Sequence, residues 1–286
     1  MAKRTSHIAK PLAARLTDDS APGDSVHFPA KRITTELEWS DLVLAPAVMA
    51  QVNEIQAWFK GGKELLTGSG LEKRVLPGFR VLFHGPPGTG KTLTACLLGK
   101  AHGVDVYRVD LSQVVSKYIG ETEKNLAAIF DRAVGKNWIL FFDEADALFG
   151  RRTQTADSHD RYASQEVAYL LQRLGDYPGL AILATNFQAN LDDAVSRRFQ
   201  ASIYFPPPDP EQRLRLWENA FPSVVKLERR INLAEIARQY EVTGGQVVNI
   251  VRYCALQAVE RSSKVIRLDD LLRGIGRELE KAGRPI

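Results

Sequence analysis

The chain has 286 residues, of which 44% are hydrophobic and 25% are charged, and its formal net charge at pH 7 is +4. This composition is typical of a globular protein and excludes collagen-like, repetitive and largely disordered chains. The two cysteines, Cys96 and Cys254, lie far apart in the sequence, which argues against a disulfide framework or a zinc site. Because no apolar run approaches the ~20 residues of a membrane span and the N-terminus lacks the apolar core of a signal peptide, we expect a soluble cytoplasmic protein.

The N-terminal segment, residues 1–34, is basic and rich in turn-forming residues. Residues 1–32 contain six lysines or arginines against three aspartates. Prolines and glycines interrupt any periodicity, so we expect a flexible arm. Its charge fits either a solvated tail or a segment that contacts nucleic acid or an acidic partner surface.

Ordered structure is expected from about Trp39 onwards. Pro46 suits the first position of a helix that ends at Gly61 and Gly62. Its apolar residues recur at helical spacing and share one face, formed by Val48, Val52, Ile55 and Phe59.

The most informative stretch runs from Val81 to Thr92 and reads VLFHGPPGTGKT. Its first three residues suit a buried strand, and the eight residues from Gly85 fit the pattern G-x-x-x-x-G-K-[ST] at every position. Glycines allow backbone N–H groups to approach a polyphosphate, and the following helix presents its positive N-terminus to it. We expect Lys91 to reach the terminal phosphates and the Thr92 hydroxyl to ligate Mg²⁺. The stretch therefore predicts a nucleoside triphosphate site formed by Gly85, Pro86, Pro87, Gly88, Thr89, Gly90, Lys91, Thr92 and Leu93.

The second expected strand covers Val104 to Val109 and leads into a segment that starts like a short helix and ends on Tyr118, Ile119 and Gly120. From Glu121 a helix resumes. An aromatic residue beside a glycine-ended loop either packs back on its own domain or is exposed for contact with something else. The residues alone leave both possibilities open for Tyr118.

A strand that is apolar on both faces runs from Trp138 and ends in Asp143 and Glu144. Such strands lie at the centre of parallel sheets, and ligands bind at their carboxyl ends. Together with the upstream glycine-rich loop, this pair predicts that Asp143 accepts from the Mg²⁺ water shell and that Glu144 orients and polarises the attacking water.

Residues 151–160 are polar, and a helix is expected from about Arg161. The next buried strand, Leu180 to Ala184, ends in Thr185 and Asn186. At that strand end Asn186 could hold the attacking water, although an isolated asparagine there is also a common turn residue.

The adjacent arginines Arg197 and Arg198 precede a last strand, Ala201 to Phe205, and three prolines mark a domain boundary. Asp209 has the features of an N-cap, with proline next and Gln212 three residues on. Everything beyond is helical in pattern, in four segments: Gln212 to Ala220, Leu233 to Tyr240, Gly245 to Ala258 and Leu268 to Leu279. We expect an α/β P-loop NTPase domain with a five-stranded parallel sheet at residues 35–207 and a small all-helical lid at 208–286.

In combination these motifs resemble the AAA+ ATPases over nearly all of residues 35–280. GPPGTGKT resembles the Walker A motif, FFDEADALF the Walker B motif, ATN sensor 1, and LDDAVSRRF the arginine-finger segment. The segment SKYIGETEKNL is similar to pore loop 1 of members that thread substrates. That likeness places Lys117, Tyr118, Ile119 and Gly120 at the axis of a ring, with Tyr118 away from its own core.

The helical segment TGGQVVNIVRYCA lacks an arginine at the usual sensor-2 position, as in the AAA clade of unfoldases and disassemblases. The resemblance implies that Gly244 and Gly245 approach the adenine and that Leu42, Val43 and Leu44 cover it. Arg252 is a poor sensor candidate. The stretches FFDEADALFG and DSHDRYASQEVAYLLQRL look most like bacterial AAA ATPases, including those found with contractile injection systems.

The resemblance implies a ring, usually a hexamer, in which ATP and Mg²⁺ lie between neighbours and Arg197 and Arg198 reach into the next subunit's site. The favoured function is a motor that remodels, unfolds or disassembles a protein substrate by pulling it through the central pore. The alternatives are a nucleic-acid-associated loader that uses the basic arm, and an ATP-dependent assembly scaffold. No helix-turn-helix, zinc or OB-like appendage supports the loader, so nucleic acid is not an expected partner. Residues 151–161 form either a second axial loop or a solvated one.

Overall fold

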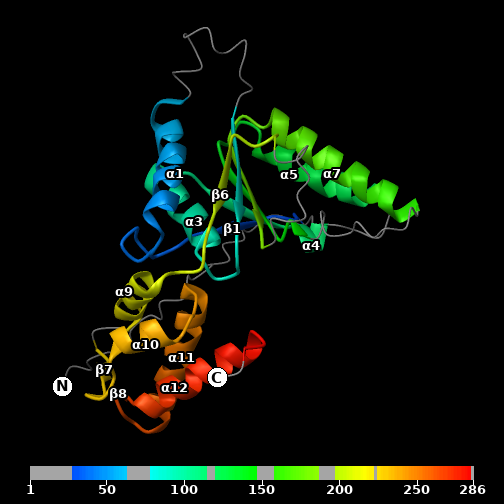
Figure 1. Cartoon of the computed structure of the whole chain (residues 1–286). Helices are drawn as coiled ribbons and strands as arrows, with labels where there is room; N and C mark the ends of the chain where they lie inside the picture. The colour runs from blue at the N-terminus through cyan, green and yellow to red at the C-terminus, as the bar shows by residue number, and fades with distance from the viewer. Residues whose placement is uncertain are drawn as a thin grey trace, which may run out of the picture.

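The computed structural model describes residues 28–62, 78–114, 120–146, 158–186, 197–221 and 224–284, with side chains of the 158–186 segment described from residue 165. Figure 1 shows two parts, a layered α/β part above and a mainly helical part below. The central sheet of the upper part has helices on both faces.

Six strands form this sheet, in the order β1-β3-β4-β5-β2-β6. β1 pairs antiparallel with β3, and the other pairs are parallel. The bounds are Lys31–Ile33 for β1, Phe79–His84 for β2, Val106–Asp110 for β3, Ile139–Asp143 for β4, Leu180–Thr185 for β5 and Ala201–Tyr204 for β6. The mainly parallel α/β fold is confirmed, whereas the number of strands is not five.

The additional strand, β1, comes from the segment that the sequence assigned to the flexible arm. That assignment is wrong for Lys31–Ile33, which pairs with β3 along its whole length. β1 has only three residues, of which Ile33 alone is buried, so it carries no alternating pattern that a sequence could reveal. Arg32 adds a hydrogen bond to the residue before β3, donating from Nε to Oδ1 of Asp105 at 2.9 Å.

Helices cover both faces of the sheet, and each face has its own core. α1 (Pro46–Ala57), its π-helical extension η1 (Trp58–Gly62) and α3 (Lys91–His102) lie on one face, and α5 (Glu121–Ala133) and α7 (Ser158–Asp176) on the other. The short α4, Leu111–Val114, follows β3 directly.

β4 shows why the central strands read as continuous apolar runs. Ile139 and Phe141 face the core under α1 and α3, while Leu140 and Phe142 face the core under α5 and α7. All four side chains are fully buried. The first polar residues after such a strand therefore lie at its carboxyl end, beside the loop that follows β2.

The helical part contains α9 (Pro210–Ala220), α10 (Leu233–Gln239), α11 (Gly244–Glu260) and α12 (Leu268–Lys281) around a core of its own that includes Trp217 and Ile250. The predicted cap of α9 is confirmed, because Asp209 Oδ1 accepts from the Gln212 amide at 2.8 Å and Gln212 Oε1 accepts in return at 3.2 Å. The expectation that no strand follows residue 205 is wrong. Two two-residue strands, β7 (Lys226–Leu227) and β8 (Val265–Ile266), pair in parallel.

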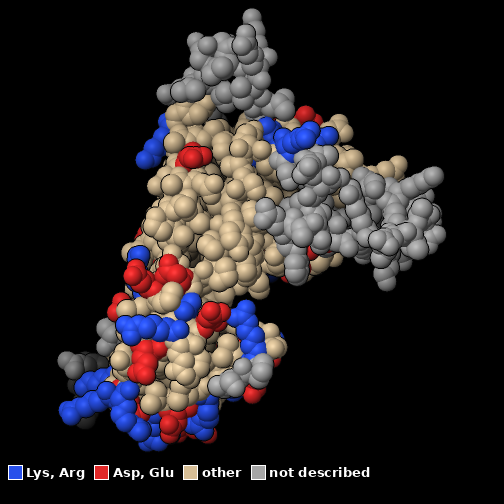
Figure 2. All heavy atoms as spheres, in the orientation of Figure 1, with Lys and Arg blue, Asp and Glu red and all other residues tan. Residues whose placement is uncertain are grey.

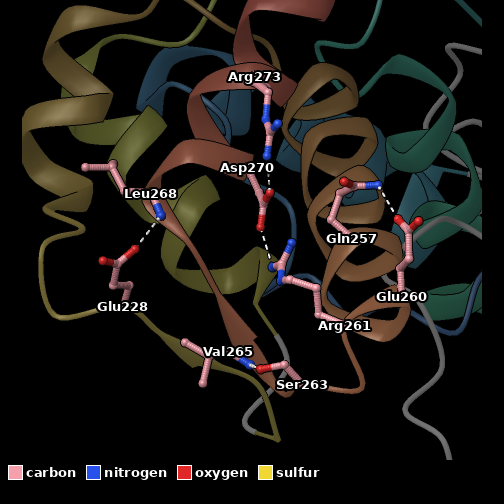
Figure 3. Close-up of polar contacts among 9 residues, drawn as sticks. All are labelled: Glu228, Gln257, Glu260, Arg261, Ser263, Val265, Leu268, Asp270 and Arg273. Atoms are coloured by element: carbon pink, nitrogen blue, oxygen red, sulfur yellow. Dashed lines mark hydrogen bonds and ion pairs between the residues drawn. The ribbon is translucent and has the colours of Figure 1, made fainter.

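A charged cluster ties the end of α11 to the start of α12 (Figure 3). The Asp270 carboxylate is fully buried and accepts from Arg261 on one oxygen and from Arg273 at 2.7 Å on the other. Glu228 caps α12 by accepting from the Leu268 amide at 2.9 Å. Figure 2 shows acidic and basic side chains intermingled over the helical part.

Candidate functional site

A cavity of about 520 Å³ opens where the carboxyl ends of the central strands meet the helical part. Its walls come from the segment before α1, the loop after β2 with the start of α3, the ends of β4 and β5, the segment after β6, α9 and the start of α11. One side is apolar and the other carries charged and amide groups, which suits a purine attached to a polyphosphate.

The loop between β2 and α3 has the backbone that its glycines imply. Gly85, Gly88 and Gly90 have φ values of +132°, +75° and +106°, a region that residues with a Cβ rarely adopt. A Cβ on Gly85 would lie 2.2 Å from the carbonyl oxygen of Phe205. Of the predicted loop residues, Pro87 through Leu93 line the cavity, whereas Gly85 and Pro86 are not part of its lining.

Lys91, at the start of α3, points back into the loop. Its Nζ donates to the carbonyl oxygens of Gly85 at 2.5 Å and Pro86 at 3.0 Å, and to Oδ1 of Asn186 at 3.1 Å. The side chain is only 8% exposed. Burial lowers the pKa of Lys91, while the charges of Asp143 and Asp146 act in the opposite direction. The loop therefore holds a buried cation at the N-terminus of a helix, where phosphate groups are favoured.

Asp143 and Glu144 reach the same cavity from the end of β4. Asp143 Oδ1 accepts from the Glu144 amide at 3.0 Å, and Oδ2 forms an ion pair with Nη2 of Arg108 at 3.0 Å. Glu144 is exposed and has a φ of +55°. A non-glycine residue in this region is strained by about 1–2 kcal/mol, and such strain concentrates at functional positions.

Asn186, at the end of β5, is held by a carboxylate that sequence reasoning missed. The Asn186 amide donates to Oδ2 of Asp146 at 3.1 Å, and the Thr185 hydroxyl donates to the other oxygen of Asp146. Asp146 thereby joins the turn after β4 to the end of β5. The only signal in the sequence was a third acidic residue three positions after Asp143.

The apolar side of the cavity combines the segment before α1 with the helical part. Leu42 and Val43 are buried and line it together with Gly244 and Gly245. The Gly245 amide donates to the carbonyl oxygen of Gly88 at 3.0 Å. The predicted adenine-side residues therefore lie together in one cavity with the loop.

This arrangement of loop, acidic strand end and asparagine has counterparts in known proteins. Residues 81–207 match the family model described as the ATPase family associated with various cellular activities (AAA). These residues are an AAA ATPase domain. The description of this family supports ATP hydrolysis as the activity of residues 81–207.

The AAA domain has many relatives among known proteins. The chain is 35% identical over 192 residues to cell division protein C of Sulfolobus acidocaldarius, a match that covers 63% of this chain and 50% of that protein. It is 34% identical over 210 residues to the peroxisomal ATPase PEX6 of Candida glabrata, covering 70% and 20%. It is 31% identical over 215 residues to the proteasome-activating nucleotidase of Methanopyrus kandleri, covering 72% and 49%. The matched regions span about half or less of these relatives.

The two candidate finger residues of the AAA domain do not line the nucleotide cavity. Arg197 and Arg198 are exposed in a turn before β6 and border a second cavity of about 300 Å³ beside Arg80. Among the described residues that line the larger cavity, Lys91 is the only lysine or arginine. The described lining of the cavity thus carries no arginine.

Several predicted features of the AAA domain fall outside the described residues. Lys117, Tyr118 and Ile119 are among them, and so are the side chains of residues 151–161. Gly120 is described, with a φ of +80° immediately before α5. The predictions for the pore loop and the second axial loop therefore stay predictions.

Two oxygen-bearing side chains of the AAA domain suit a metal ion. Thr92 and Asp143 both border the cavity, and hydroxyl and carboxylate oxygens suit Mg²⁺, which keeps most of its water ligands. No group of three or more His, Cys, Asp or Glu residues able to hold a metal occurs among the described residues.

In that same part of the chain no helix combines the length and apolarity that crossing a membrane requires.

Both cysteines are packing residues. Cys96 and Cys254 are buried, and burial raises the pKa of each thiol to about 12. A thiol with so high a pKa is almost entirely protonated at neutral pH and is a poor nucleophile.

Proposed function

We propose that the chain is an ATP-driven ring motor, usually hexameric, that remodels, unfolds or disassembles a protein substrate by pulling it through a central pore. The observation that carries this proposal is the separation of the arginines from the cavity. The cavity contains the groups that bind phosphate and activate water, whereas Arg197 and Arg198 lie exposed at another surface. We infer that a neighbouring copy of the chain supplies the arginine that the described lining lacks, and such a residue can accelerate phosphoryl transfer by ~10³ or more.

Within one site, we assign roles by position. Lys91 and the loop amides bind the phosphates, while Thr92 and Asp143 hold Mg²⁺, which neutralises charge on the phosphate oxygens when it is bound. Glu144 is exposed at the cavity and orients the attacking water. The backbone amide of Asn186 is held by Asp146 and its side-chain oxygen by Lys91, so the side-chain NH₂ group is available to hold the attacking water.

The helical residues 208–286 act as a lid on the ATPase domain, residues 35–207. Two described bonds join the parts directly. The Gly245 amide donates to Gly88, and Asn219 Nδ2 donates to the carbonyl oxygen of Ser40 at 3.2 Å. Nucleotide bound beside these contacts changes the position of the lid relative to the ATPase domain. Hydrolysis changes the bound nucleotide and therefore moves the lid again.

The substrate contact is assigned to Lys117, Tyr118, Ile119 and Gly120. This segment connects α4, which follows β3, with α5. Tyr118 offers a flat amphipathic grip that does not depend on substrate sequence. The resemblance to bacterial ATPases of contractile injection systems suggests one setting for such a motor.

The test uses fluorescein-labelled casein, an unfolded protein, as the substrate probe. In the presence of ATP, Glu144→Gln protein is expected to form a ring that retains casein, measured by fluorescence anisotropy. Tyr118→Ala in this background is expected to abolish casein retention while ATP binding persists. Tyr118→Phe is the matched control, because it keeps the aromatic side chain, and it should retain casein. Casein retention that is unchanged by Tyr118→Ala would contradict the proposal of a motor and favour a scaffold. Single-stranded DNA that stimulates the ATPase with a steep salt dependence would instead favour a loader.

A further inference from the structure

Arg108 approaches the nucleotide cavity from a strand that supplies none of the predicted site residues. β3 and β4 are parallel, with Arg108 opposite Phe141 and Asp110 opposite Asp143. Because side chains alternate along a strand, Arg108, Phe141 and Asp143 project from the same face of the sheet. That face lies under α3, the helix that begins with Lys91.

The guanidinium of Arg108 is directed at Asp143. Its Nη2 lies 3.0 Å from Asp143 Oδ2, and the two side chains are 30% and 19% exposed. The Nε of Arg108 is buried and has no hydrogen-bond partner among the described residues. The ion pair with Asp143 is therefore the contact that orients the end of this side chain in the described part of the structure.

The second oxygen of Asp143 is engaged as well. Oδ1 accepts from the amide of Glu144, the residue with the positive φ. With one oxygen held by Arg108 and the other by the next peptide, the carboxylate plane and the backbone leading into Glu144 are fixed together. Residues that orient a ligand carboxylate from behind in this way commonly change metal affinity or activity by about 10–100-fold when mutated.

We propose that Arg108 is a positioning residue for ATP hydrolysis, which holds Asp143 and, through it, Glu144, and which moderates the attraction of Asp143 for the divalent cation. The proposal rests on the proposed function only in so far as Asp143 and Glu144 serve hydrolysis. It does not depend on the ring, the arginine fingers or the pore loop.

Two effects of opposite sign follow from removing the Arg108 charge. The backbone at Glu144 loses its support, so the rate of the chemical step falls. Asp143 loses a neighbouring positive charge, so its attraction for a divalent cation rises, because unit charges a few ångströms apart in a partly buried site interact strongly. A purely structural role would not produce this opposition.

The experiment compares Arg108→Gln and Arg108→Lys with a matched control, Arg32→Gln. Arg32, in β1, also forms an ion pair with an aspartate, Asp105, which directly precedes β3, at 2.8 Å. It does not line the nucleotide cavity. Each variant is assayed for kcat and KM for ATP, for binding of a fluorescent ADP analogue in EDTA and against Mg²⁺ concentration, and for thermal stability.

Arg108→Gln is expected to lower kcat about tenfold or more. It is also expected to lower the Mg²⁺ concentration for half-maximal enhancement of analogue binding about threefold or more, with binding in EDTA nearly unchanged. Arg108→Lys keeps the charge and the wild-type Mg²⁺ dependence, and Arg32→Gln changes neither quantity. A kcat for Arg108→Gln within about twofold of wild type would overturn the proposal. So would equal losses of kcat, nucleotide affinity in EDTA and melting temperature, which indicate a structural role. An ATPase that proves independent of protein concentration would contradict the ring and leave the test of Arg108 intact.

Discussion

The amide of Gly245 donates to the carbonyl oxygen of Gly88 at 3.0 Å, so the first turn of α11 rests directly on the phosphate-binding loop. A Cβ on Gly245 would lie 3.0 Å from the Cα of Gly88, a backbone atom that cannot turn aside. A Cβ on the preceding Gly244 would first meet the end of the Leu216 side chain, at 3.4 Å. These two neighbouring glycines therefore differ in what they tolerate.

Gly245→Ala is expected to weaken ATP binding about fivefold or more, because the overpacked contact tilts α11 away from the loop at a cost of about 1–3 kcal/mol. Gly244→Ala is the matched control, since both alanines raise helix propensity equally. Titration with a fluorescent ATP analogue measures the difference. Equal affinities in the two variants would show that ATP binding does not depend on the contact between α11 and the loop.

Asp270→Asn is expected to destabilise the protein by about 2 kcal/mol or more, because it leaves Arg261 and Arg273 without the carboxylate that joins them. Burial raises the pKa of Asp270, but the hydrogen bonds and charges of the two arginines outweigh it, and the net pKa is below its ordinary value. A lowered folded-state pKa means that the stabilisation is complete above about pH 4 and is lost as the pH falls through the lowered value.

Urea unfolding at several pH values measures this contribution. The difference between wild type and Asp270→Asn should be constant near neutral pH and should shrink below about pH 4. The neighbouring exposed residue provides the control, Asp269→Asn, which is expected to change stability by less than about 0.5 kcal/mol. A difference that stays constant down to about pH 2 would exclude the ionised carboxylate as its source.

Substitutions of Glu144 distinguish the role of its side chain in hydrolysis from the effect of its backbone strain on stability. Glu144→Gln should retain ATP binding and lose hydrolysis, because the amide cannot polarise the water. Glu144→Gly and Glu144→Ala should be equally inactive, but the glycine variant should be the more stable by about 1 kcal/mol, since only glycine adopts a φ of +55° without strain. Thermal unfolding of the three variants provides the comparison, and an alanine variant as stable as the glycine variant would show that the backbone relaxes there.

Arg197 and Arg198 can be tested by mixing subunits. Arg197→Ala/Arg198→Ala subunits keep an intact cavity, and Lys91→Ala subunits keep intact arginines, so mixed interfaces should recover ATPase activity that neither variant has alone. The rate per subunit of wild-type protein should also rise with protein concentration. No recovery at any mixing ratio, together with a flat concentration dependence, would mean that hydrolysis is completed within one chain.

Three features could be predicted from the sequence because each is a contiguous pattern whose chemistry acts within a few residues. They are the P-loop glycines, the acidic strand end at Asp143 and the Asp209 cap. Helical and strand periodicity extended this to most elements of the sheet and of the helical part. β1 escaped because a three-residue edge strand with one buried side chain has no period, and its assignment depends entirely on its partner β3.

The connections among site residues were decided only by the fold. Arg108 meets Asp143, Asp146 meets Asn186, and Gly245 meets Gly88 across separations of 35 to 157 residues. Nothing in the local chemistry of either partner specifies these pairs. They form because strand register and the packing of the helical part bring distant segments to one edge of the sheet, where polar groups that are partly removed from water must find partners. Thus local sequence motifs determined which chemical groups the site contains, and the tertiary structure determined how those groups are oriented.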